Sequence, residues 1–265
     1  MTKMQRNAVV WILLSGGVSI LWGLFAARAG NEWVDFRAIY FGSRCLIDHQ
    51  NPYNVSELES VYRTEGGARP AESAQVHQAV TLFVNVPTTL LLAAPLAILP
   101  LKSAEVVWIA ITVGVYLLAA WLIWDIGARF APTIALWLVC IVLINSEAIF
   151  CTGNTAGIVV SLTVVAVWCS LMERFTPAGI LAMALSLAIK PHDAGLVWLF
   201  LLLMGGIYRK RALQSLVITS VIGLSAILWI ALIAPHWLQD WQGNLAAISA
   251  HGGINEPGPA SVTAH

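Results

Sequence analysis

Charged side chains are scarce in this sequence, at 11% of its 265 residues, whereas hydrophobic residues make up 58%. Soluble domains carry about 25% charged residues. The mean hydropathy is correspondingly high, at +0.78. This composition excludes an ordinary soluble enzyme and predicts a polytopic membrane protein.

The sequence also lacks a basic excess and any metal-binding motif. Lys and Arg number 14 and so do Asp and Glu, which leaves no basic surface for a nucleic acid. There are only four cysteines, and Cys140, Cys151 and Cys169 lie in apolar segments, where a thiol behaves as a small hydrophobe. Neither a CxxC pair nor a His/Cys cluster is present, so we expect no zinc site and no other metal.

Long apolar segments recur along the chain, and most approach the roughly twenty residues that cross a bilayer as a helix. They cover residues 8–27, 81–99, 105–124, 133–150, 154–172, 177–204 and 212–234. We therefore predict an all-α membrane bundle of about seven transmembrane helices. One domain would cover residues 1–235, with a long outer loop at 28–80 inside it. Residues 236–265 would form a polar tail, interpreted as an outer loop cut short.

The distribution of basic residues predicts how the helices are oriented. With a cytoplasmic N-terminus, the inner side would hold Lys3, Arg6, Lys102 and the cluster 209–211. The outer turns would hold Arg129 and Arg174, each near an acid. The positive-inside rule favours this arrangement in a plasma (inner) membrane and places the loop 28–80 on the outer face. The segments 133–150 and 154–172 are alternatively re-entrant and do not cross fully.

One carboxylate, that of Asp35, lies where the first hydrophobic segment ends and water begins. It could cap a short surface helix, because Asp is a favoured N-cap residue. It could instead serve a reaction at the membrane surface. The apolar residues after it have helical spacing, which predicts an amphipathic helix lying on the membrane.

A second group of polar residues interrupts the apolar segment 177–204. Lys190, His192 and Asp193 surround Pro191, which removes a backbone hydrogen bond and opens the helix. A charge at mid-bilayer costs about 3 kcal/mol or more unless it is paired. Lys190 and Asp193 could neutralise each other at i, i+3. Alternatively, the group forms a cationic site for an anion such as a lipid phosphate.

A third polar position is Asn154, which follows Gly153 between two apolar segments. Its side chain could cap the helix that follows. Its amide could alternatively reach a sugar or phosphate in the same cavity as Lys190.

In their order, these stretches resemble glycosyltransferase family 87, which comprises membrane mannosyl- and arabinosyl-type transferases of the GT-C fold. The matching motifs are Asp35-Phe36 with Tyr40, the turn 50–53, Pro95-Leu96-Ala97-Ile98-Leu99-Pro100, Gly153-Asn154, and Leu187-Ala188-Ile189-Lys190-Pro191. Phe83-Val84-Asn85-Val86-Pro87 matches more loosely. The resemblance covers most of residues 10–235. Family members usually continue with several more helices, so we expect a truncated relative.

The resemblance implies a donor in which a sugar, mannose or a related hexose or pentose, is linked to a polyprenyl phosphate. The acceptor would be a lipid or glycan at the outer face. Asp35 would be the general base, with inversion at the anomeric carbon. Lys190 and Arg37 would bind the leaving phosphate, and Tyr40, Asn154 and His192 would contact substrate. The donor is a substrate, so no cofactor is expected.

Two other functions remain compatible with the residues. A transporter or lipid-handling protein could use Lys190, His192 and Asp193 on a broken helix. We find no internal repeat, and such a protein would not need the acidic loop 28–80. A non-catalytic, truncated relative is the other possibility.

Overall fold

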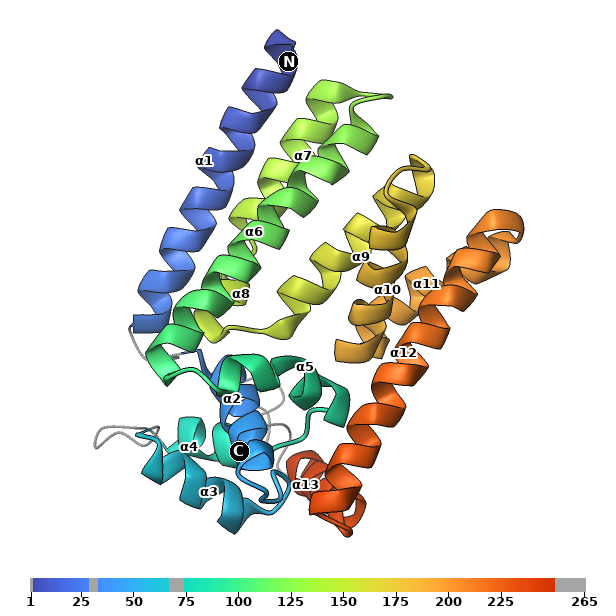
Figure 1. The fold of residues 1–265 in the computed structure, drawn as a ribbon. Helices are drawn as coiled ribbons and strands as arrows, with labels where there is room; N and C mark the ends of the chain where they lie inside the picture. The colour runs from blue at the N-terminus through green and yellow to red at the C-terminus, as the bar shows by residue number, and fades with distance from the viewer. Residues whose placement is uncertain (1, 29–32, 67–73, 251–265) are drawn as a thin grey trace. The chain divides into compact units, whose positions relative to one another are not determined.

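The computed structural model describes residues 2–28, 33–66 and 74–250, and within these ranges every regular element is helical (Figure 1). Two compact units divide the chain. The first contains Met1–Trp33 and Glu105–Gly223, and the second contains Val34–Ala104 and Leu224–His265. The predicted all-α class is therefore confirmed.

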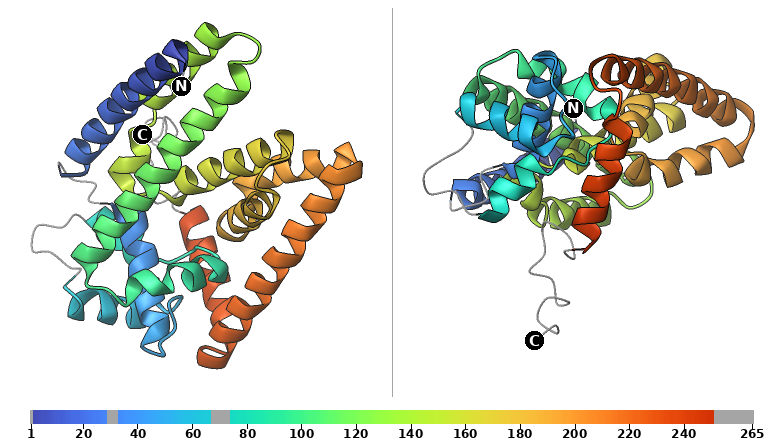
Figure 2. Two further views of the ribbon diagram at one scale, coloured as in Figure 1. Left: turned by 45° about the horizontal axis from the view of Figure 1, so that its top comes forward. Right: turned by 90° about the horizontal axis from the view of Figure 1, so that it is seen from below.

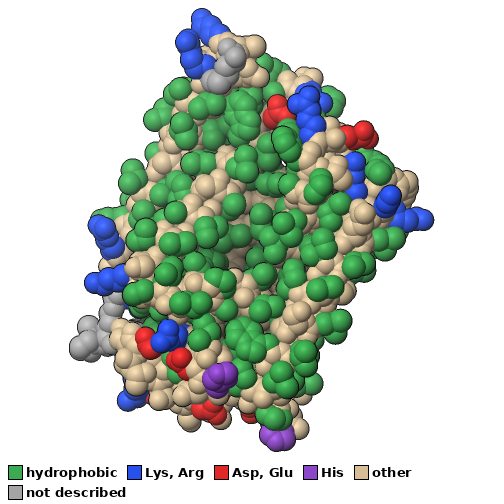
Figure 3. Space-filling model, in the orientation of Figure 1, with side chains coloured by type: hydrophobic (Ala, Val, Ile, Leu, Met, Phe, Trp, Pro, Cys, Tyr) green, Lys and Arg blue, Asp and Glu red, His purple; other side chains and the backbone are tan. Residues whose placement is uncertain are grey.

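The first unit begins with helices that pack around one apolar core. They are α1 (Lys3–Ala26), α6 (Leu101–Gly127), α7 (Pro132–Ile144) and the short α8 (Ala148–Thr152). Tyr116 and Trp124 of α6 lie in this core, and the Tyr116 hydroxyl donates to the carbonyl of Leu143, at 2.9 Å. The outer faces of these helices are apolar as well, as Figure 3 shows. A helix that is hydrophobic all round suits a membrane.

The remaining helices of this unit are α9 (Thr155–Leu171), α10 (Thr176–Ile189), α11 (Pro191–Met204) and the first part of α12 (Gly206–Ile233). The predicted single segment 177–204 is wrong, because α10 and α11 form a hairpin (Figures 1 and 2). Gly179 and Leu201 line one small cavity, whereas a straight helix would separate them by about 33 Å. Pro191 starts α11 at the position where a helix tolerates proline.

The hairpin changes which charges share an end of the first unit. Lys190 forms its turn, so it lies at an end of two helices and not at the middle of one. The opposite ends of the helices carry a set of basic residues: Lys3, Arg6, Arg129, Arg174, Arg209, Lys210 and Arg211 (Figure 1). The predicted separation of Arg129 and Arg174 from the N-terminal basic residues is therefore wrong.

Four stretches are long and apolar enough to cross a membrane: Lys3–Ala26, Leu101–Gly127, Pro132–Thr152 and Gly206–Ile233. The other apolar helices have 10–17 residues, fewer than the roughly twenty that a span needs. The predicted segment 81–99 contains only α5 (Pro87–Ala97), which has 11 residues. The structure supports a membrane protein and leaves the count of seven spans unconfirmed.

The second unit is built around α2 (Val34–Ile47), which packs against α3 (Val55–Thr64), α4 (Ala74–Thr81) and α5. Eleven of the fourteen residues of α2 are buried. The prediction of an amphipathic helix lying on the membrane is therefore wrong. Neighbouring helices cover both sides of α2, because apolar residues occupy nearly its whole circumference.

Helix α13 (Trp237–Ala250) completes the second unit and occupies part of the predicted polar tail. The side-chain amide of Asn244 donates to the carbonyls of Tyr53 and Phe83, each at 3.0 Å. The Trp241 indole donates to the carbonyl of Val84, at 2.8 Å. These bonds satisfy loop carbonyls that would otherwise be buried without partners.

Replacing Gly23 by Ala is expected to destabilise the first unit. A Cβ at this position would lie 2.6 Å from the carbonyl oxygen of Glu147 and 2.6 Å from the Cβ of Phe150. Since the first of these atoms is backbone, α1 would have to move away, at a cost of about 1–3 kcal/mol. The thermal midpoint of the purified protein in detergent measures the loss.

Gly17→Ala is the matched control, because it lies on the same helix and a Cβ there meets nothing within 4 Å. It should leave the midpoint unchanged or raise it slightly, since alanine favours a helix over glycine. Equal midpoints for the two variants would show that α1 does not approach α8 this closely.

Candidate functional site

Asp35 occupies the first turn of α2 and is half-buried. It is the second residue of the helix, so it does not act as the N-cap. A carboxylate in the first turn interacts favourably with the helix dipole. Trp33, two residues before Asp35, donates its indole N–H to the carbonyl of Phe150, at 2.8 Å, within the first unit. Asp35 therefore sits at the start of α2, two residues after a side chain that is held by a hydrogen bond.

The structure places Arg37 and Tyr40 inside the second unit, where each side chain is only 1% exposed. The Tyr40 hydroxyl donates to the carbonyl of Leu99, at 2.7 Å. A buried guanidinium is costly unless its surroundings compensate the charge. Both side chains thus belong to the packing around α2, although the sequence suggested substrate contacts for them.

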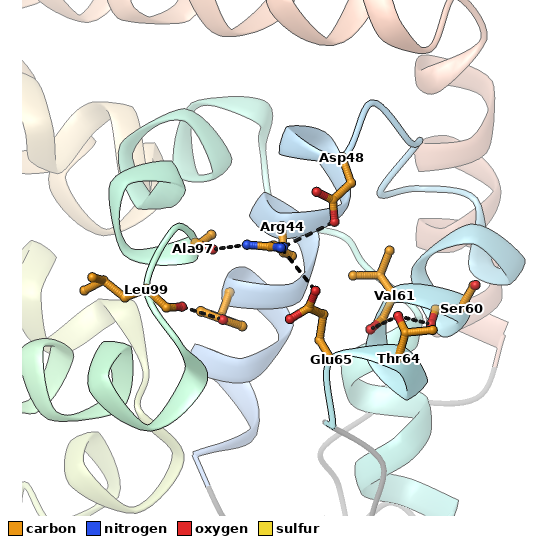
Figure 4. A network of polar contacts seen from close by, with 9 residues as sticks. Arg44, Asp48, Ser60, Val61, Thr64, Glu65, Ala97 and Leu99 are labelled. Carbon is orange, nitrogen blue, oxygen red and sulfur yellow. Dashed lines mark hydrogen bonds and ion pairs between the residues drawn. The ribbon is translucent and has the colours of Figure 1, made fainter.

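Arg44 holds the other end of α2, a role that the sequence analysis missed. Its guanidinium lies 3.2 Å from Asp48 and 3.2 Å from Glu65, and it donates to the carbonyl of Ala97, at 3.3 Å (Figure 4). These contacts connect α2 with the end of α3 and the end of α5. The i, i+4 spacing of Arg44 and Asp48 was the one signal in the sequence.

Burial also keeps two side chains of the second unit neutral. It raises the pKa of the Tyr53 hydroxyl and of the Cys45 thiol, with the acids Glu57 and Asp48 adding to the effect at Cys45. Neither group can act as a nucleophile or base near neutral pH.

Asn154 and Lys190, which are 36 residues apart in the sequence, meet at one end of the first unit. The Lys190 ammonium donates to the Asn154 side-chain oxygen, at 2.9 Å. The same oxygen accepts from the backbone N–H of Ala156, at 2.8 Å, and so caps α9. Gly153 supplies the preceding left-handed residue, with a φ of 70°, and its carbonyl accepts from the Trp108 indole, at 3.1 Å. The N-terminus of α9 and the Lys190 ammonium group therefore lie next to each other.

The ion pair between Lys190 and Asp193, one of the two alternatives for this group, is not formed within the described part of the chain. Asp193 Oδ1 instead lies 3.4 Å from Nε2 of His192. The other oxygen of Asp193 is buried without a hydrogen-bond partner among the described residues. The side chain of His192 is 73% exposed. Lys190 therefore contacts Asn154 and forms no ion pair along its own helix within the described residues.

A groove of about 400 Å³ runs along α9, lined almost wholly by apolar side chains of α6, α7, α8 and α9. On α9 its lining begins at Ala156 and Gly157 and continues to Val164. This lining starts two residues after Asn154. On α9, the polar residue at the N-terminus is therefore followed directly by residues that line the apolar groove. The arrangement suits a molecule with an anionic head and a long hydrocarbon tail.

A comparison with protein families identifies the chain. Residues 83–264 match the model of glycosyltransferase family 87, which is more than half of the sequence. The chain belongs to this family. No curated protein and no solved structure gave a significant match.

The family 87 match covers only some of the predicted site residues. The matched residues include Asn154, Lys190 and His192, whereas Asp35 and the rest of its motif precede them. Within residues 2–28, 33–66 and 74–250, no group of three or more His, Cys, Asp or Glu side chains could hold a metal ion. Membership of family 87 indicates that the chain is a membrane glycosyltransferase. The roles of single residues remain proposals.

Proposed function

We propose that this family 87 member transfers a sugar from a polyprenyl-phosphate donor to a lipid or glycan acceptor. The observation that carries the proposal is the contact between Asn154 and Lys190, two residues before the first α9 residue that lines the apolar groove. Lys190 and the N-terminus of α9 suit a phosphate. The groove suits the isoprenoid chain, which cannot remain in water.

The basic residues of the first unit support the proposed orientation. Apart from Arg28 and Lys190 itself, they gather at the end of its helices opposite Asn154 and Lys190. The positive-inside rule makes that end cytoplasmic. The N-terminus is then inside, and the phosphate of the donor is bound at the outer face of a plasma (inner) membrane.

Within this proposal each predicted residue has a role that fits its position. Asp35, half-buried at the start of α2, takes the proton from the acceptor hydroxyl. Direct attack by that hydroxyl inverts the anomeric carbon. Lys190, with Asn154 and the exposed His192, binds the phosphate that leaves. Arg37 and Tyr40, both buried, fix α2 and thereby position Asp35.

The test is sugar transfer in membranes that contain the chain, supplied with radiolabelled polyprenyl-phosphate mannose. We expect label in the lipid or glycan fraction, and we expect none from a nucleotide-linked mannose. The anomeric configuration of the product should be opposite to that of the donor. A protein that neither binds nor uses any polyprenyl-phosphate hexose or pentose would disprove the proposal, and binding without transfer would indicate a non-catalytic relative.

A further inference from the structure

A second groove of the first unit, of about 530 Å³, lies between α1 and the connection from α7 to α8. Its α1 wall consists of Val18, Leu21, Trp22 and Phe25. These positions follow helical spacing, and all four side chains are more than half exposed. Its other wall is Ile144, Asn145 and Glu147. The groove therefore opens toward lipid and contains one carboxylate.

Glu147 has no cationic partner within the described part of the chain. Its side chain does not cap α8, although it stands at the N-cap position. Its backbone is fixed, because its carbonyl lies against Gly23 of α1. An ionisable residue on a membrane-facing surface is stabilised by a partner of opposite charge, and among the described residues Glu147 has none.

The aromatic residues set the depth of this groove. Trp22 and Phe25 belong to the last turns of α1, with ring centroids 6.1 Å apart. Aromatic side chains near the ends of spans lie at the level of the lipid headgroups. Both rings also attract a cation placed over their faces. The groove thus combines a carboxylate with two aromatic rings at headgroup depth.

We propose that this groove binds a phospholipid with an ammonium headgroup, such as phosphatidylethanolamine. The ammonium pairs with the carboxylate of Glu147 and lies beside Trp22 and Phe25, and the acyl chains run along Val18 and Leu21 of α1. Charge complementarity selects this occupant. An anionic headgroup would be repelled by Glu147, and an uncharged sugar headgroup would leave the carboxylate without a counter-charge. The site is separate from the Lys190 site and does not rest on sugar transfer.

Native mass spectrometry of the purified full chain in a non-ionic detergent tests this proposal. The protein is offered equal amounts of dioleoyl phosphatidylethanolamine, dioleoyl phosphatidylglycerol and a diglucosyl diacylglycerol. We expect the ethanolamine lipid to be retained preferentially. Glu147→Gln should lower its retention about tenfold, which corresponds to about 1.4 kcal/mol, and Trp22→Leu should lower it about fivefold.

Glu173→Gln is the matched control, since Glu173 is exposed in the turn between α9 and α10. It makes the same change of charge away from the groove and should leave retention unchanged. Thermal midpoints equal to that of the wild type establish that each variant is folded. Equal retention by wild type and Glu147→Gln, an equal loss in Glu173→Gln, or a preference for the glucosyl lipid would overturn the proposal.

Discussion

Asp35→Asn is expected to abolish sugar transfer while leaving donor binding intact. Asparagine has the shape of aspartate but cannot accept a proton, and a positioned general base contributes about 10²- to 10⁴-fold to a rate. The fold should tolerate the change, because Asp35 is half-buried whereas the packing of α2 rests on its eleven buried residues. The measurement is the initial rate of transfer from polyprenyl-phosphate mannose, beside equilibrium binding of the same donor.

Asp48→Asn provides the control at the opposite end of α2. Asp48 is the exposed partner of Arg44, and an exposed ion pair contributes about 1 kcal/mol or less. This variant should retain nearly the wild-type rate. If Asp35→Asn transferred sugar as fast as Asp48→Asn, Asp35 would not be the base.

The helical membrane architecture was predictable because it depends on composition. Transfer of apolar side chains out of water favours lipid-buried helices regardless of how the helices pair. Pro191 likewise predicted a break in the helix, since proline removes a helical hydrogen bond wherever it stands. Both predictions rest on properties of single residues or short segments and need no knowledge of distant contacts.

The direction of the chain after the break was not predictable in this way. An interrupted apolar run is compatible with a kinked span and with a hairpin, and 14-residue helices such as α10 and α11 are too short for the usual length criterion. The hairpin becomes evident only from the approach of Gly179 to Leu201, which line one small cavity. That contact joins residues that sequence spacing alone treats as unrelated.

The burial of α2 was not predicted either, because it also depends on contacts between residues that are distant in the sequence. Its hydrophobic residues were assigned to a membrane surface, but α3, α4 and α5 cover them. Part of the second unit also comes from the far end of the chain, since Asn51 donates to Asp240 at 2.6 Å. The burial of Arg37 could not be read from a pattern in which arginine normally marks an exposed face.

Lys190→Met is expected to raise the KM for the donor and to lower the rate of transfer. Methionine keeps the length and flexibility of the side chain but removes its charge. Loss of a preorganised charge beside a developing anion costs about 10²- to 10³-fold. Lys190→Arg should recover part of the activity, because it restores the charge with a different geometry. Steady-state rates over a range of donor concentrations separate the two parameters.

Lys210→Met is the matched control, since Lys210 is exposed near the start of α12. It should change neither parameter. Asn154→Ala should have a mixed effect, because it removes the cap of α9, worth about 1 kcal/mol, and also releases the Lys190 ammonium. A KM unaffected by Lys190→Met would contradict a phosphate site at this turn.

The pattern of the Lys190 and Asp35 variants separates an enzyme from a protein that only moves or holds lipid. A lipid-handling protein needs the cation that binds phosphate but has no use for a proton acceptor. Its lipid binding would fall in Lys190→Met, and no activity would depend on Asp35. In a glycosyltransferase, Lys190→Met impairs both binding and rate, whereas Asp35→Asn removes the rate alone. The two variants therefore distinguish the functions even though each tests a different unit of the chain.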